Sequence, residues 1–158
     1  MENIREWKMI RSVLLALIAI FIALPAIAAE GVINVQSPHS VKETADRLND
    51  VLTSKGMTVF NRIKHSEAAA GVGIQLADAE LIIFGNPKAG SPLMKCQLSV
   101  ALDLPQKALV WSDDQSTVWI SYNDPAYLIK RHAISDCDAV ILKISKALAG
   151  ITKAAVTE

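Results

Sequence analysis

A polar loop in the middle of the chain combines residue types that bind ligands. The apolar run 81–84 leads directly into this loop, which carries Asn86, Lys88 and Ser91. Polar groups between a strand end and a helix start often form binding sites, because free helix amides and the helix dipole attract anions. Lys88 adds a positive charge, so the loop is a candidate site for a small anionic ligand. The alternative, favoured because such residues so often only form turns, is a purely structural loop.

The sequence of this loop does not match the nucleotide-binding P-loop, a well-known kind of phosphate site. Gly85 and Gly90 have the spacing of a nucleotide-binding P-loop. Ser91 and Pro92, however, occupy the positions at which that motif requires Lys and then Ser or Thr. Pro92 also lacks an amide donor. Binding of a nucleotide by the P-loop mechanism is therefore excluded.

Residues elsewhere in the chain offer acid–base and charge-pairing chemistry. His65 and His132 are candidates for a catalytic base, since histidine exchanges protons near neutral pH. The candidate ligand-binding residues are Asn86, Lys88, Ser91, Asp103, Tyr122 and Arg131. Each has a structural alternative, because a histidine can be an ordinary core or surface residue and Asp103 can form an ion pair with Arg131 or Lys107.

The sequence gives little support for a metal or a cofactor. His65 and His132 lack a third ligand, and the chain has no H-x-x-x-H or C-x-x-C pattern. We therefore expect no metal and no cofactor. Cys96 and Cys137 can form a disulfide in an exported protein or remain two buried thiols, because sequence spacing alone does not show proximity.

Residues 1–28 have the pattern of a secretory signal peptide. A basic segment precedes an apolar run, and Ala26 and Ala28 stand where signal peptidase reads small residues. We expect cleavage near Ala28 and a periplasmic location. The alternative is an uncleaved membrane anchor, although the apolar run is shorter than the ~20 residues of a typical spanning helix.

The rest of the chain has the size and composition of one domain. We expect residues 29–152 to fold as a unit and residues 153–158 to form a frayed tail. The full chain has 16 basic and 16 acidic residues. Because there is no basic stripe, we expect no nucleic-acid partner. Membrane contact is expected only through the signal segment, if that segment stays uncleaved.

Hydrophobic periodicity and turn residues predict strands alternating with helices. The expected strands are residues 31–36, 57–64, 79–84, 107–111 and 117–122, with 79–84 in the centre of the sheet. Residues 65–70 form one helical turn or a loop, and residues 72–76 form a short strand or a helix. The expected helices begin after Ser40, at Ser91–Pro92, after Asp124, and at Ser135 or Asp136.

This order of elements predicts a single domain of the α+β class. We expect a mostly antiparallel sheet of about five strands, with helices packed largely on one face. The opposite face would then be solvated or paired with another surface. Because exposed apolar sheet faces are rare in monomers, we expect a homodimer.

Three long segments carry a resemblance to a known family. They are FGNPKAGSPLM at residues 84–94, ALDLPQKALVW at 101–111 and VWISYNDPAYLIKRH at 118–132. In this order and spacing they resemble the bacterial family called domain of unknown function 302. The resemblance implies a compact α+β domain, often dimeric, found alone or behind an export signal, with no agreed biochemical activity. Cys96 and Cys137 do not belong to the family pattern, which argues against a catalytic role for either.

Two hypotheses of function follow from these residues. The first is an exported ligand- or partner-binding module with an anion-friendly site at the strand–loop–helix junction. The alternative is a small periplasmic hydrolase or lyase that uses a histidine base, with Lys88 and Arg131 as substrate clamps. A pocket in which a histidine, Lys88 and Tyr122 converge would favour the enzyme, whereas a shallow surface with scattered histidines would favour binding or scaffolding.

Overall fold

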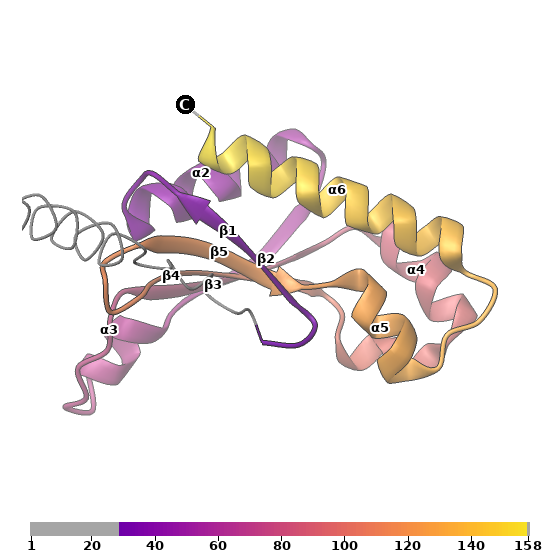
Figure 1. Cartoon of the computed structure of the whole chain (residues 1–158), viewed down its shortest axis with the longest axis horizontal. Coiled ribbons are helices and arrows are strands. Elements are labelled where there is room, and N and C mark those ends of the chain that lie inside the picture. Colours follow the sequence, from indigo (N-terminus) through magenta and orange to yellow (C-terminus); the bar gives the residue numbers. More distant parts are fainter. Residues whose placement is uncertain (1–28, 158) are drawn as a thin grey trace, which may run out of the picture.

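The computed structural model describes residues 29–157 of the 158-residue chain. In chain order the elements are β1 (Val32–Ser37), α2 (Val41–Ser54), β2 (Thr58–Lys64), α3 (His65–Ala70), β3 (Ala79–Gly85), α4 (Pro87–Cys96), the 3-10 helix η1 (Leu98–Leu102), β4 (Gln106–Ser112), β5 (Val118–Asn123), α5 (Pro125–His132) and α6 (Asp138–Val156). Figure 1 labels all of them except η1. The predicted signal peptide, its cleavage near Ala28 and the membrane-anchor alternative lie outside the described residues. Within the described part, no helix is both long and apolar enough to cross a membrane.

Five strands form one antiparallel sheet in the order β1-β5-β4-β3-β2. The predicted α+β fold with a single domain is therefore confirmed. The prediction that residues 79–84 form the central strand is wrong, because β4 is in the middle and β3 lies between β4 and the edge strand β2. Both β3 and β4 are interior strands with one buried face, so their apolar composition does not show which of the two lies in the middle of the sheet.

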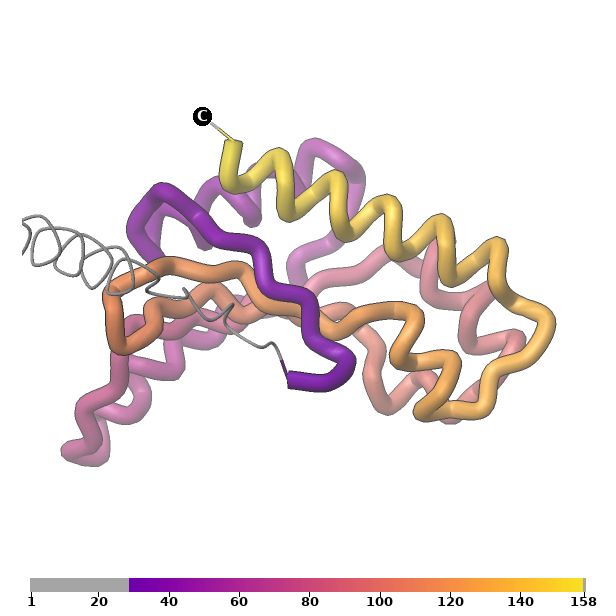
Figure 2. The backbone as a smooth tube through the Cα atoms, viewed as in Figure 1, coloured from indigo at the N-terminus to yellow at the C-terminus, as the bar shows by residue number. Residues whose placement is uncertain are grey.

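Helices α2 and α6 lie side by side over one face of the sheet (Figures 1 and 2). Alternate strand residues such as Ile82, Phe84 and Ile120 point to that face and are fully buried. They pack with Leu48 of α2 and Leu148 of α6, which are also buried. Burial of this apolar face supplies the main stabilisation of the domain.

Local capping signals explain where α2 begins and ends. Ser40 is the N-cap, and its hydroxyl accepts a hydrogen bond from the amide of Glu43 at 3.2 Å. The Glu43 carboxylate lies 3.2 Å from His39 Nδ1, so it contacts the preceding loop. Gly56 follows the helix with a φ of +70°, a left-handed conformation that glycine adopts without steric cost.

The start of α4 differs from the prediction. The helix begins at Pro87 with Asn86 as N-cap, and Pro92 lies inside the helix. Asn86 has the extended backbone of a cap residue, and its side chain accepts from the amide of Lys88 at 2.9 Å. The predicted start at Ser91 is therefore wrong, because the earlier Asn–Pro pair already provides the cap and the first helical residue.

The last helix begins later and ends later than predicted. Its N-cap is Cys137, so the caps predicted at Ser135 or Asp136 are wrong. The helix runs to Val156. The prediction of a frayed tail over residues 153–158 is therefore wrong for residues 153–156, which are helical. Ala155 is fully buried, and Arg47 of α2 donates hydrogen bonds to the carbonyls of Ala155, at 2.8 Å, and of Thr157. These contacts hold the helix end on α2.

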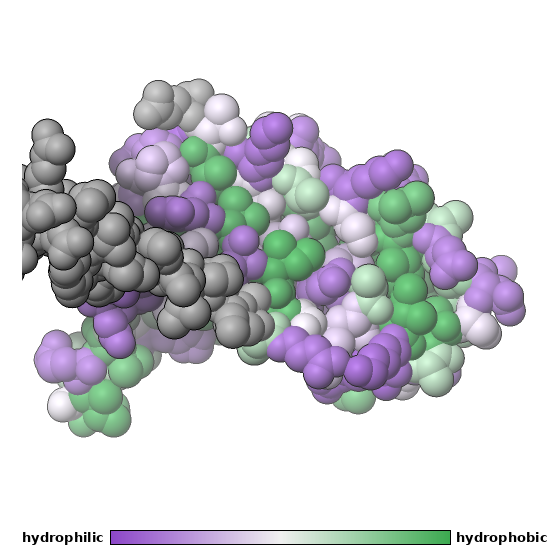
Figure 3. Space-filling view, in the orientation of Figure 1, coloured by the Kyte–Doolittle hydropathy of each residue, from purple (hydrophilic) through white to green (hydrophobic). Residues whose placement is uncertain are grey.

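The segment between α3 and β3 has neither of the two structures considered for it. Residues 72–76 form no strand or helix, because no neighbouring strand pairs with them. Val72, Ile74 and Leu76 are more than half exposed. Figure 3 shows apolar side chains at this protruding end of the molecule. The preceding residues 65–70 form the single short helix α3.

Candidate functional site

The loop singled out in the sequence borders a concave site. A cavity of about 310 Å³, here called the apolar pocket, lies between α4, the segment joining η1 to β4, and α6. Its walls are mainly apolar side chains, including Met57, Phe60, Met94, Leu104, Pro105, Ile144 and Leu148. Asn86 and Ser91 also contribute to the lining. A mainly apolar cavity of this size is typical of small-molecule sites.

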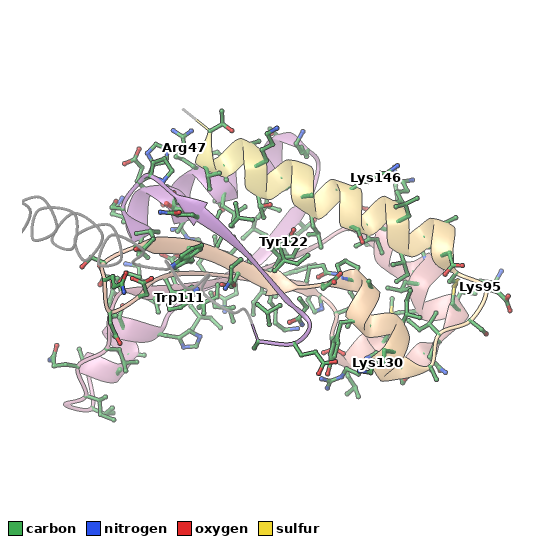
Figure 4. All side chains as sticks on the ribbon, in the orientation of Figure 1. Arg47, Lys95, Trp111, Tyr122, Lys130 and Lys146 are labelled. Carbon is green, nitrogen blue, oxygen red and sulfur yellow. A yellow bond between two sulfur atoms is a disulfide. The ribbon has the colours of Figure 1, made fainter. Side chains whose placement is uncertain are left out.

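A second cavity of about 390 Å³ adjoins the first and differs from it in charge. It is here called the lysine pocket, because Lys55, Lys88, Lys143 and Lys146 line it. The two pockets share Met57, Asn86, Ala89 and Ala147, so they adjoin, and the two together are here called the groove. Figure 4 shows Lys146 projecting from α6 on the side away from the sheet.

The N-terminus of α4 has no free amides to offer an anion. The amide of Lys88 donates to the Asn86 side chain, and the amides of Ala89 and Gly90 donate to the Asn86 carbonyl at 2.9 and 3.0 Å. Asn86 also donates its side-chain amide to the carbonyl of Gly56 at 3.0 Å. Asn86 therefore has a structural role, as the turn alternative held, and the helix amides form no anion cradle because the cap already occupies them.

Lys88 and Ser91 lie on the groove, whereas Tyr122 lies in the core. Lys88 is exposed and lines the lysine pocket, and Ser91 lines the apolar pocket. Tyr122 is only 4% exposed. Burial raises the pKa of its phenol, partly offset by a hydrogen bond with Thr152 of α6. Tyr122 therefore packs under α6 and does not line the groove, because the inner side of β5 is covered by that helix.

Asp103, Arg131 and His132 come together in a separate polar cluster. His132 Nε2 lies 2.5 Å from Asp103 Oδ2, and Arg131 Nε lies 3.1 Å from the same oxygen. His132 Nδ1 lies 3.0 Å from the hydroxyl of Ser99. The side chains of His132 and Asp103 are 5% and 13% exposed. This polar cluster (Ser99, Asp103, Arg131 and His132) joins α5 to the segment around η1.

The two predicted candidates for a catalytic base lie far apart in the fold. His65 begins α3 at one end of the sheet, and His132 ends α5 at the opposite end (Figure 1). Neither histidine lines the apolar pocket or the lysine pocket. A histidine, Lys88 and Tyr122 therefore do not converge in either of these pockets, and this convergence was the arrangement that would have favoured the enzyme.

Cys96 and Cys137 are joined by a disulfide. Cys96 is the last residue of α4 and Cys137 is the N-cap of α6. The bridge thus connects two helices that both line the apolar pocket. Among residues 29–157, no group of three or more His, Cys, Asp or Glu side chains is arranged to hold a metal ion.

Sequence reasoning missed several residues of both regions. Lys55, Lys143 and Lys146 of the groove were not predicted, and neither was Ser99 of the polar cluster. The spacing of Lys143 and Lys146 places them near one another on a helix, which is a detectable signal. Their position beside Lys88, however, follows from the packing of α6 against α4, which no local pattern shows.

The fold and the groove define a small α+β domain with a ligand-sized cavity, and the comparisons assign its family. Residues 33–151 match the family described as "Domain of unknown function DUF302". The chain belongs to this family, as the three sequence segments predicted. A crystal structure of an uncharacterized conserved DUF302 protein from Bacillus stearothermophilus has the same fold, with a TM-score of 0.73 and 21% sequence identity. The match covers 80% of this chain and 99% of that one.

Curated relatives carry a different name. The chain is 42% identical over 118 residues to "Fluoride-specific ion channel FluC 1" of Brucella suis biovar 1 (strain 1330), covering 75% of this chain and 46% of that protein. The proteins of the same name in Brucella abortus and "FluC 2" in Brucella melitensis give the same identity, with 44% of their length covered. The chain thus spans about half the length of the curated relatives that it matches.

Proposed function

We propose that this DUF302 domain is an exported ligand-binding module whose site is the groove between α4 and α6. The observation that supports it is the apolar pocket, a cavity of about 310 Å³ beside the loop that carries Asn86 and Ser91. Apolar walls stabilise a ligand by removing its hydrocarbon surface from water. The disulfide between Cys96 and Cys137 fixes one end of the walls, which reduces the cost of ordering the site on binding.

The name of the relatives suggests fluoride conduction as another candidate function. The part that they share with this chain is less than half of their length. The described residues of this chain include no helix suited to crossing a membrane. We therefore propose that the shared part of those proteins is a binding domain attached to a separate conducting part. On this proposal the present domain does not conduct ions itself.

Direct binding of a neutral fluorescent dye tests the binding site. N-phenyl-1-naphthylamine should bind with increased fluorescence, and Ala147→Phe should abolish the signal, because Ala147 lines both pockets. Ala149→Phe is the matched control, since Ala149 is exposed on the same helix and does not line either pocket. Equal dye binding by the two variants would contradict the proposal.

The polar cluster favours a second candidate function, the hydrolase considered from the sequence. If His132 carries its proton on Nε2 and donates a hydrogen bond from there to Asp103, then Nδ1 is free to accept a hydrogen bond from the Ser99 hydroxyl. Ser99 would be the nucleophile, His132 the base, and Arg131 a positive group beside them. Lys88 lines the groove and has no contact with this cluster among the described hydrogen bonds and ion pairs.

Hydrolysis of p-nitrophenyl acetate tests this second function. The purified protein should release p-nitrophenol above the buffer rate, and Ser99→Ala should remove the excess. Ser91→Ala is the control, because Ser91 lines the groove and not the polar cluster. Excess turnover that survives in Ser99→Ala, or no turnover at all in the wild type, would exclude the serine hydrolase.

Export and dimerisation are also proposals. Strand residues that point away from α2 and α6, such as Leu81, Ile83 and Trp111, are only partly buried, and a second copy of the chain would cover them. Native mass spectrometry of protein purified from the periplasm would report cleavage, the disulfide and the oligomer together. A monomer that retains residues 1–28 would contradict both proposals.

A further inference from the structure

We propose that the ligand of the groove is a single-chain amphiphile with an anionic head, such as a long-chain carboxylate. Its hydrocarbon chain would occupy the apolar pocket, and its head would lie among the four lysines of the lysine pocket. This inference rests on the proposed function and adds the chemical class of the ligand.

Four positive side chains converge on the lysine pocket from three different helices. Lys55 is the C-cap of α2, Lys88 lies in the first turn of α4, and Lys143 and Lys146 lie on α6. All four are exposed. Their convergence is a property of the tertiary fold, because they are far apart in the sequence except for the pair on α6.

These lysines differ from others in the chain by having no acidic partner. Within residues 29–157, none of the four lies in an ion pair, and no carboxylate lines either pocket. By contrast, Lys42, Lys64 and Lys130 each contact an aspartate or glutamate at 2.6–2.8 Å. The full chain has equal numbers of acidic and basic residues, so the absence of acids here is a local feature.

Unpaired like charges around one cavity attract an anion. Lys143 and Lys146 are one helical turn apart, a spacing at which like charges repel and weaken a helix slightly. An anionic group placed among the four would reverse this repulsion, and the attraction would weaken as salt increases. The arrangement is therefore favourable to an occupied site and mildly unfavourable to an empty one.

The apolar pocket restricts where the polar part of a ligand can lie. A polar group placed deep in it would lose hydration and could regain hydrogen bonds only at a few side chains such as Ser91 and Gln106, since the walls are mainly hydrocarbon. The Asn86 side chain is already bonded to Gly56 and Lys88. Because Met57, Ala89 and Ala147 border both pockets, the two cavities are adjacent, and the proposal places the chain in the first and the head group in the second.

Matched probes separate the head group from the chain. Dodecanoate and dodecanol, each below its aggregation threshold, are tested by displacement of N-phenyl-1-naphthylamine from the purified full chain. At low salt we expect dodecanoate to bind roughly tenfold more tightly than dodecanol, because a few weakly screened charge pairs contribute about that much. The difference between the two affinities should shrink as sodium chloride is added.

Variants of the lysines complete the test. The double variant Lys143→Ala/Lys146→Ala should weaken dodecanoate binding roughly tenfold and leave dodecanol binding unchanged. The matched control is Lys95→Ala/Lys153→Ala, which removes two exposed lysines from the same helices α4 and α6 without changing the pocket lining. The control should bind both probes like the wild type.

Three other results would overturn the inference, and they differ from one another. Equal binding of both probes, unaffected by the lysine substitutions, would agree with the proposed ligand-binding module but contradict the proposal that its ligand has an anionic head. Absence of binding by either probe and by the dye would contradict the proposed function as well. Sedimentation with vesicles of anionic phospholipid, without binding of monomeric dodecanoate, would indicate a membrane surface in place of a single-chain ligand.

Discussion

The groove and the polar cluster lie on either side of the segment 103–105, but in the part of the chain that the structure describes the charged side chains are paired in the cluster and unpaired in the groove. In the cluster, Asp103 contacts both Arg131 and His132, and His132 also contacts Ser99. In the groove, Lys88 and Lys146 have no such partners among the described residues, and they border a cavity. The cluster satisfies its polar groups internally, whereas the groove presents its charges to a space that a ligand can fill.

This difference separates structural charge from charge available for binding. Polar groups that are buried and bonded to one another hold elements together, and removing one of them leaves its partners unsatisfied. Exposed charges beside an apolar cavity contribute little to the fold and are available to an external partner. Substitutions in the cluster should therefore change stability, and substitutions of the groove lysines should change affinity.

The largest effect is expected from the disulfide, because it ties together α4 and α6, the two helices that line the groove. Cys96→Ala/Cys137→Ala should lower the free energy of unfolding by about 2–5 kcal/mol, since the bridge closes a loop of 41 residues between α4 and α6. Urea unfolding of the variant and the oxidised wild type measures this. The dye should also bind more weakly to the variant, because α4 and α6 are no longer tied together. An unchanged midpoint would show that helix packing alone holds the groove.

A smaller loss of stability is expected in the polar cluster. Asp103→Asn should lower the free energy of unfolding by about 1–3 kcal/mol, because His132 and Arg131 lose their shared charged partner. Dodecanoate affinity should stay the same. Asp114→Asn is the control, since Asp114 is exposed in the turn between β4 and β5. Loss of dodecanoate binding in Asp103→Asn at unchanged stability would reverse the assignment of the two regions.

The smallest effect is expected where paired charges are exposed. Hydrogen bonds from Lys42 and then from Arg62 lower the pKa of Asp46 below its ordinary value of 3.8. Because the folded-state pKa is lowered, the stabilisation is present above pH 3.8 and is lost as pH falls through the folded-state pKa. Asp46→Asn should therefore cost less than about 1 kcal/mol at neutral pH, since the pair is on the surface.

Urea unfolding at a series of pH values measures the contribution of Asp46. The stability difference between wild type and Asp46→Asn should be constant above pH 4 or so and shrink in stronger acid. A difference that grows as pH falls would contradict the role of Asp46 as a paired carboxylate.

Local signals in the sequence predicted the fold well where a residue acts on its own neighbours. Ser40 and Asp124 cap the predicted helices, because each side chain bonds to an amide two or three residues away. Asn86–Pro87 and Ser91–Pro92, however, carry the same cap-and-proline signal. The bond from Asn86 to the carbonyl of Gly56, 30 residues away, distinguishes the first pair, and no local pattern contains it.

The candidate site was harder to predict for the same reason. The sequence indicated the loop at Asn86 and Lys88, which borders the groove, but it also suggested His65 and Tyr122, which do not. Which side chains share a cavity depends on the packing of α6 against α4 and on the burial of one face of β5. These are contacts between residues distant in sequence, and one chain without aligned relatives does not show them.

The most direct test of the account is to map dodecanoate on the isotopically labelled protein by the shifts of its backbone amide resonances. We predict saturable shifts in Ala89 of α4 and Ala147 of α6, which line both pockets, and in Leu104 beside them. The amides of His132 and Trp119 should remain unchanged. Shifts centred on Ser99 and His132, with none along the groove, would contradict the assignment of the binding site.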